Sequence, residues 1–164
     1  MRQLYSVFDT LEPMEKQSVQ KVAKDDLPAL VARVLEKLPT KETRNKAALI
    51  TLSGELGAGK TTFTQALARA LGVADTVVSP TYVLMKSYAL SGQPFEKLVH
   101  IDAYRLSDAA EFAALEPAEF LLDPGALVVV EWPERIEGAL PAPDVALKLS
   151  SQDASSEERY IQFD

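Results

Sequence analysis

The chain has 164 residues, a formal net charge of −7 and no cysteine. This length predicts a single domain, residues 1–164, with a core large enough to fold without disulfides or a structural metal. The acidic balance argues against a nucleic-acid-binding surface as the main function, because phosphate contacts need clustered Lys and Arg. No apolar run approaches the roughly 18 residues of a membrane span. We therefore expect a soluble, cytoplasmic protein that acts without a membrane.

The N-terminal part of the chain contains one clear element. Residues 1–20 show no sustained periodicity and are interpreted as a poorly defined extension. An amphipathic helix follows, with Asp25 or Asp26 as its N-cap and Pro39 at its end. Its apolar side chains recur at helical spacing at Leu27, Leu30, Val31, Val34, Leu35 and Leu38.

The stretch Gly54–Thr61 fits the phosphate-binding loop pattern G-x-x-x-x-G-K-[ST] at every fixed position. An apolar run of strand length, 47–52, precedes it, and a helical pattern that ends at Gly72 follows, which is the context that this motif requires. Glycines let consecutive N–H groups point at one anion, and the helix N-terminus adds partial positive charge. We expect Lys60 to reach the β- and γ-phosphates and the Thr61 hydroxyl to hold Mg²⁺. The expected nucleotide contacts are Glu55, Leu56, Gly57, Ala58, Gly59, Lys60, Thr61 and Thr62.

The second half of the chain alternates short strands with short helices. Residues 83–88 and 95–101 predict a hairpin around a Ser91–Gly92 turn, inserted before the next core strand. Asp108 with Glu111 predicts the start of a short helix, and Pro117 ends it and starts another. The most apolar run, 126–130, predicts a strand buried on both faces. Alternation at 145–149 and 160–163 predicts a terminal hairpin, so the elements together indicate an α/β domain.

Two apolar strands end in acids, Asp102 and Glu131. Ligands in parallel α/β sheets lie beyond the carboxyl ends of the strands, where the phosphate loop also begins. Both acids are therefore expected at one Mg²⁺-nucleotide, and we expect Lys60, Asp102 and Glu131 to be catalytic. One acid would hold the metal, directly or through water, and the other would orient or deprotonate the attacking water. The alternative for each is a solvated residue at a strand end.

Other polar residues near these motifs leave alternatives open. Thr81 is a candidate sensor of the γ-phosphate or an ordinary turn hydroxyl. His100, the single histidine, lies inside a strand, which favours a packed or hydrogen-bonded role over that of a general base. The sequence from Asp102 to Arg105 lacks the glycine of the GTPase D-x-x-G loop, and no N-K-x-D motif follows. ATP is therefore favoured over GTP.

Four blocks together resemble the TsaE (YjeE) family. They read GELGAGKTT from Gly54, SPTY from Ser79, HIDAYR from His100 and EWP from Glu131, and their order and spacing fit over about 120 residues. This resemblance implies a P-loop NTPase-like three-layer fold with a mixed, mostly parallel central sheet and inserted and terminal hairpins. It also places Thr61 and Glu131 in the Mg²⁺ site, with Asp102 as a Walker B-like acid. One departure is Glu116, since the family often has Gly at that point.

The same resemblance implies a function. The family's members are ATP-binding and hydrolysing components of the machinery that forms N6-threonylcarbamoyladenosine at position 37 of tRNA. They act on a complex of TsaB-like and TsaD-like proteins and meet tRNA only indirectly. We expect ATPase activity that is weak alone and stimulated by the partners, with Ser79–Tyr82 and the turn after Trp132 as candidate partner-responsive segments. The alternatives are a small-molecule kinase, although no arginine-rich lid is evident, and an adaptor that senses nucleotide without hydrolysis.

Overall fold

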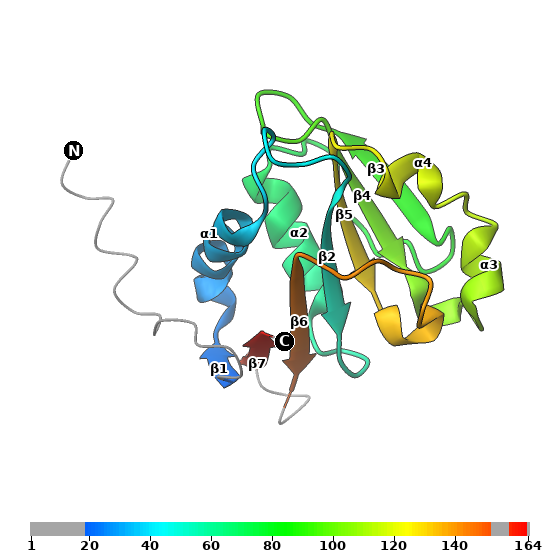
Figure 1. Ribbon diagram of the computed structural model, residues 1–164. Coiled ribbons are helices and arrows are strands. Elements are labelled where there is room, and N and C mark those ends of the chain that lie inside the picture. The colour runs from blue at the N-terminus through cyan, green and yellow to red at the C-terminus, as the bar shows by residue number, and fades with distance from the viewer. Residues whose placement is uncertain (1–18, 152–157, 164) are drawn as a thin grey trace.

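The computed structural model describes residues 19–151 and 158–163 (Figure 1). In these ranges seven strands form one sheet in the order β1-β7-β6-β2-β5-β4-β3. The strands are β1 (Val19–Val22), β2 (Ala48–Ser53), β3 (Met85–Ala89), β4 (Lys97–Asp102), β5 (Ala126–Glu131), β6 (Val145–Ser150) and β7 (Arg159–Phe163). The helices are α1 (Leu27–Lys37), α2 (Lys60–Ala70), α3 (Ala109–Ala113) and α4 (Ala118–Leu121).

The sheet is parallel at its centre and antiparallel towards both edges. β2 pairs in parallel with β5 and β6, and β4 pairs in parallel with β5. β3 pairs antiparallel with β4, β7 with β6, and β1 with β7. The predicted α/β fold with a mixed sheet, an inserted hairpin and a terminal hairpin is therefore confirmed. Parallel pairing is confined to the four central strands.

Helices cover both faces of the sheet, which gives three layers (Figure 1). Successive residues of a strand point to opposite faces. Accordingly, Leu98 and Leu127 pack in the core beneath α1 and α2, whereas Val99 and Val128 pack in the core beneath α3 and α4. All six residues of β5 are buried, as expected for a strand covered on both faces.

Local signals in the sequence explain where several helices end. Gly72 has φ 76°, and the N–H groups of Gly72 and Val73 donate to the carbonyls of Arg69 and Ala68. This is a Schellman C-cap, whose left-handed position suits glycine. Glu116 has φ 52°, between α3 and α4. The departure noted in the sequence thus falls at a backbone position that favours glycine.

One N-terminal expectation needs correction, and a second is confirmed in position but not in its hydrogen bond. Residues 19 and 20 belong to β1 and not to an undefined extension; residues 1–18 lie outside the described residues. Asp26 occupies the N-cap position of α1, but its carboxylate makes no cap hydrogen bond there. Instead it accepts the Ala23 N–H at 3.1 Å, because a 3₁₀ turn at 24–26 precedes the helix and competes for this side chain.

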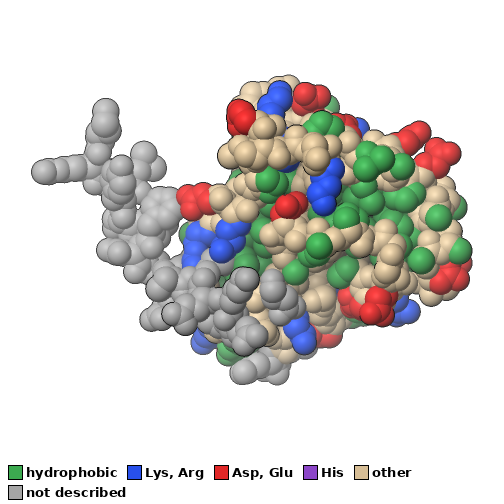
Figure 2. Space-filling model, viewed as in Figure 1, with side chains coloured by type: hydrophobic (Ala, Val, Ile, Leu, Met, Phe, Trp, Pro, Cys, Tyr) green, Lys and Arg blue, Asp and Glu red, His purple; other side chains and the backbone are tan. Residues whose placement is uncertain are grey.

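The described surface agrees with the composition. In the view of Figure 2, Lys and Arg side chains of the described residues occur in small groups among acidic ones and form no continuous patch on this face. None of the helices in the described ranges combines the length and the apolar character needed to cross a membrane.

Candidate functional site

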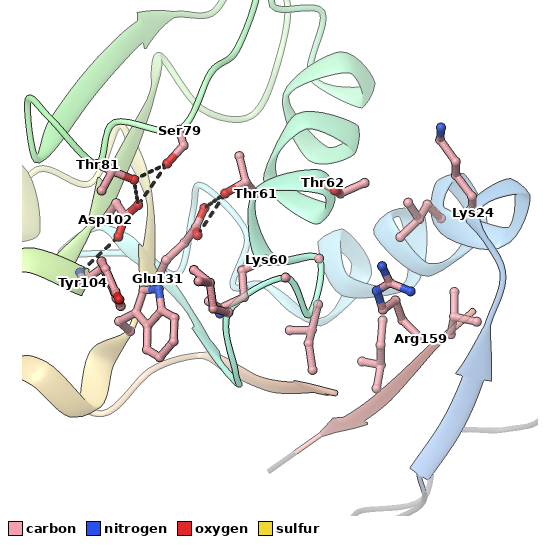
Figure 3. A pocket seen from close by; sticks show the side chains of 18 of the residues that line it. Lys24, Lys60, Thr61, Thr62, Ser79, Thr81, Asp102, Tyr104, Glu131 and Arg159 are labelled. Atoms are coloured by element: carbon pink, nitrogen blue, oxygen red, sulfur yellow. Dashed lines mark hydrogen bonds between the residues drawn. The ribbon is translucent and has the colours of Figure 1, made fainter. Parts of the chain in front are cut away.

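A cavity of about 590 Å³ opens at the carboxyl ends of the parallel strands, where the sequence predicted a ligand site. The loop before α2, the ends of β4 and β5, and residues of β1 and β7 line it (Figure 3). It has two dissimilar ends, a polar one around Lys60, Asp102 and Glu131 and a more apolar one around Leu27 and Ile161. We call these the phosphate end and the base end.

The loop Gly54–Gly59 fits against the end of β6. Gly54 has φ 131°, and a Cβ on it would lie 1.9 Å from the carbonyl oxygen of Leu149. Only glycine fits at this close approach of two backbones. Gly59 is the N-cap of α2 with φ 100°, so it also occupies the left-handed region. The glycine spacing of the motif thus has a steric reason as well as an electrostatic one.

Lys60 is folded back onto the loop. Its Nζ donates to the carbonyl oxygens of Gly54 at 2.6 Å and Glu55 at 2.8 Å and lies 3.8 Å from the centre of the Trp132 ring. The side chain is only 4% exposed, and this burial lowers the pKa of Lys60, against the opposing effect of nearby carboxylates, Glu131 foremost. The ammonium is thus close to the loop on which an anion is expected.

Glu131, at the end of β5, joins two other segments of the site. The Thr61 hydroxyl donates to both of its carboxylate oxygens, at 3.0 and 3.1 Å. His100 Nε2 lies 2.7 Å from Oε1. Glu131 and His100 are both buried. The structure therefore brings together Thr61 and Glu131, two of the three residues expected at the metal, the third being Asp102.

Asp102, at the end of β4, organises a separate set of hydroxyls. Its Oδ2 accepts hydrogen bonds from Ser79, at 3.0 Å, and from Thr81, and its Oδ1 accepts the Tyr104 N–H at 3.0 Å. Thr81 lies in a turn, and its hydroxyl is hydrogen-bonded to this buried acid. Asp102 is also in register with Glu131 across β4 and β5, so the two acids occupy neighbouring strand positions.

The donor set at the phosphate end suits a hard cation such as Mg²⁺. Within the described ranges, no group of three or more His, Cys, Asp or Glu residues forms a ready-made metal site. Mg²⁺ commonly takes one or two carboxylates and completes its shell with water and substrate phosphates. The carboxylate of Glu131 and the hydroxyl of Thr61 fit that description, so the residues present are compatible with a metal that arrives with a nucleotide.

The base end is formed by apolar side chains from separate parts of the chain. They are Val22, Leu27, Leu149 and Ile161. Lys24 and Arg159 lie at the same end in Figure 3. A flat, largely apolar ring such as adenine suits this lining, while the two cations can meet polar or anionic parts of a ligand. No motif marks the four apolar residues of this end, because each occurs in an ordinary apolar pattern.

Two of the eight expected nucleotide contacts do not line the cavity with the others. Ala58 is fully buried in the core under α1 and α2, and the Glu55 carboxylate turns to Ser151, accepting its N–H at 2.6 Å. A phosphate loop uses such positions through its backbone, so their side chains need not line the cavity. The remaining expected contacts line the cavity: Leu56, Gly57, Gly59, Lys60, Thr61 and Thr62.

Comparisons with known proteins give a consistent result. Residues 23–161 match the family model described as threonylcarbamoyl adenosine biosynthesis protein TsaE. The tRNA threonylcarbamoyladenosine biosynthesis protein TsaE of Haemophilus influenzae is 34% identical over 122 residues, which cover 74% of this chain and 72% of the relative. The protein of the same name from Bacillus subtilis is 39% identical over 115 residues, 70% and 68% of the two chains. The crystal structure of Bacillus subtilis YdiB matches with a TM-score of 0.63 and 29% identity, covering 93% of this chain and 87% of that one.

Proposed function

The chain belongs to the TsaE family of tRNA threonylcarbamoyladenosine biosynthesis proteins, and we propose that it contributes to this tRNA modification by binding and hydrolysing ATP. The observation that carries the proposal is the contact between Thr61 of the phosphate loop and Glu131, beside the buried Lys60. A phosphate cradle, a cation and a carboxylate–hydroxyl pair at one end of a cavity are the parts that ATP hydrolysis requires.

Each of these residues has a defined task in the proposal. The N–H groups at the start of α2 and the Lys60 ammonium bind the phosphates. Thr61 and Glu131 hold the nucleotide's Mg²⁺, which when bound neutralises charge on the β- and γ-phosphates. Asp102 orients Ser79 and Thr81 near the γ-phosphate position, because both hydroxyls donate to its carboxylate. These two hydroxyls, together with Asp102 and Glu131, then position the attacking water.

The proposal assigns the base end to adenine. Val22, Leu27 and Ile161 offer apolar surface that a purine ring can cover. Arg159 lies beside the loop, since a Cβ on Gly59 would be 3.6 Å from its side chain. A guanidinium in that position can stack on the base or contact the α-phosphate.

Partner stimulation is part of the same proposal. The described residues that line the cavity include one arginine, Arg159, which lies on β7 at the base end. Arg105 and Arg135 lie over the rings of Tyr82 and Tyr104 and are not among the lining residues. An arginine that stabilises the transferred phosphoryl is therefore expected from outside, and supplying one accelerates hydrolysis by roughly 10³-fold or more. TsaB-like and TsaD-like proteins are the proposed partners, and tRNA is contacted through them.

The test measures ATP turnover by the chain alone and with purified TsaB-like and TsaD-like proteins, alongside multi-round modification of tRNA. We expect slow turnover alone, strong acceleration by the complex, and modification that stops early when the chain is omitted. Equal turnover in both cases, together with full modification without the chain, would contradict the proposal. A phosphorylated small molecule as product would support the kinase alternative instead, and ATP binding without turnover would support the adaptor.

A further inference from the structure

His100 is the buried polar residue that the proposed function leaves without a role. It lies on β4, is 0% exposed, and its Nε2 is 2.7 Å from Oε1 of Glu131. Because a carboxylate only accepts hydrogen bonds, Nε2 carries the hydrogen and donates a hydrogen bond to Glu131. His100 and Asp102 are two residues apart on one strand, so their side chains project to the same sheet face. On that face the ring contacts the carboxylate of Glu131.

The surroundings of His100 make a purely packing role costly. Its neighbours on the same face of the sheet, Leu98 and Val129, belong to the apolar core beneath α1 and α2. Its Nδ1 has no hydrogen-bond partner among the described residues. A buried nitrogen without a partner costs free energy that an apolar side chain would not incur. The contact with Glu131 is therefore the interaction that offsets this cost.

Glu131 in turn depends on this donor. The described side chains that donate to its carboxylate are Thr61 and His100. The O–H bond of Thr61 rotates freely, and in the proposed function the hydroxyl oxygen faces the metal, so its hydrogen bonds to Glu131 can change. The His100 imidazole is fully buried on β4, so its packing holds the ring in place. His100 then becomes the donor that stays in place when a ligand is bound.

We propose that His100 is a positioning residue, which holds Oε1 of Glu131 so that the carboxylate faces Thr61 and the Mg²⁺ of the nucleotide. This inference rests on the proposed function. Partners of metal ligands fix ligand orientation, and their loss commonly lowers metal affinity or activity by about 10- to 100-fold. We therefore expect the loss of His100 to weaken only the part of nucleotide binding that depends on Mg²⁺.

The test compares His100→Leu with His100→Gln, whose amide nitrogen can take the place of Nε2 and donate to Glu131. Nucleotide binding is measured by calorimetry with and without Mg²⁺, and thermal unfolding is recorded for each variant. We expect His100→Leu to keep the parent's Mg²⁺-free affinity and to lose about 10- to 100-fold of the gain that Mg²⁺ gives. His100→Gln should recover most of that gain, which a general loss of packing would not allow.

Tyr88→Phe is the matched control. Tyr88 is buried on neighbouring β3, and its hydroxyl, like Nδ1 of His100, has no partner among the described residues. Removing this hydroxyl alters a buried polar atom nearby without touching Glu131, so Mg²⁺-dependent binding should not change. If His100→Leu does not fold, His100→Asn replaces it. The shorter Asn amide retains polarity but does not reach Glu131, so it should fall below His100→Gln.

Two outcomes overturn the inference. One is parent-like Mg²⁺-dependent binding in His100→Leu or, where that variant does not fold, in His100→Asn. The other is an equal loss of affinity with and without Mg²⁺, which would indicate a packing role. Glu131→Gln separates this inference from the proposed function. If it abolishes Mg²⁺-dependent binding while His100→Leu does not, only the role of His100 is wrong. If neither matters, the Mg²⁺-ATP site itself is wrong.

Discussion

The two ends of the cavity are built in opposite ways. At the phosphate end, buried charged groups are each held by named partners: Lys60 by two loop carbonyls, Glu131 by Thr61 and His100, and Asp102 by three donors. These residues come from the loop and from the ends of the central parallel strands β4 and β5. At the base end, apolar side chains of β1, β6 and β7 and the start of α1 provide surface, with Lys24 and Arg159 beside them.

The phosphate end is therefore suited to fixing the positions of ligand atoms, and the base end to contributing binding affinity. A network of charged hydrogen bonds fixes atoms to within a narrow range, which chemistry at a phosphate demands. An apolar surface tolerates small displacements of a ring, and it contributes binding free energy in proportion to the area it covers. We therefore expect substitutions at the phosphate end to affect turnover or Mg²⁺-phosphate binding strongly, and substitutions at the base end to affect nucleotide affinity moderately.

The largest effect is expected for Asp102→Asn and Glu131→Gln. Both substitutions keep the size of the side chain but remove the charge that positions the metal or the water. Turnover in the presence of the partners should fall by about 100-fold or more, and by more than ATP binding does, because these acids act mainly in the transition state. Steady-state turnover and calorimetric titration measure the two quantities. Glu119→Gln, on the exposed part of α4, is the control, and parent-like turnover in either site variant would remove that acid from the mechanism.

Lys60→Ala should come next. Loss of a charge-assisted contact to phosphate costs about 1.5–3 kcal/mol, which is about one to two decades in Mg-ATP affinity. Lys46→Ala removes an exposed lysine before β2 and should bind ATP like the parent. Calorimetric titration distinguishes them, and unchanged affinity in Lys60→Ala would refute the role assigned to the loop.

The contrast between the two ends also explains what the sequence could predict. The phosphate end was found because its chemistry needs fixed residue types at fixed spacings, and because a buried strand followed by an acid is a local pattern, as at Glu131. The base end combines Leu27, Leu149 and Ile161 from three distant segments, and each resembles any other core residue. The hydrogen bond between His100 and Glu131 depends on how β4 pairs with β5, which neither strand encodes alone. The hydrogen bond of the Asp26 carboxylate could not be predicted, because two adjacent helical turns compete for that side chain.

Truncation at the base end should have a moderate effect. Leu27→Ala removes part of the apolar lining at the start of α1, and a loss of about 1 kcal/mol corresponds to roughly fivefold weaker ATP binding. Inorganic triphosphate lacks a base, so its affinity should stay at the parent's value. Thermal unfolding must show that the variant is folded at the temperature of titration. Equal losses for ATP and triphosphate would mean that Leu27 supports the loop and not the base.

The smallest effect concerns Glu55, the loop residue that ties the phosphate end to β6. Its carboxylate accepts the N–H of Ser151 at 2.6 Å and the Ser151 hydroxyl at 3.2 Å. The hydrogen bond from the Ser151 backbone, more than any other contact, lowers the pKa of Glu55 below its ordinary value. A carboxyl whose pKa is lower in the folded state stabilises the fold above the unfolded-state pKa, and this contribution disappears as pH falls through the folded-state pKa.

Glu55→Gln tests this contact, because Gln can accept the same hydrogen bonds but does not titrate. Since Glu55 is exposed and screened by solvent, we expect the parent to be more stable at neutral pH by only about 0.5 kcal/mol. Urea unfolding at a series of pH values should show the two proteins converging as the pH falls through the lowered folded-state pKa of Glu55, where the carboxylate becomes protonated. Added salt should reduce the difference at neutral pH, whereas Glu119→Gln should follow the parent throughout. A constant difference between parent and Glu55→Gln across the whole pH range would mean that the charge of Glu55 does not hold the loop against β6.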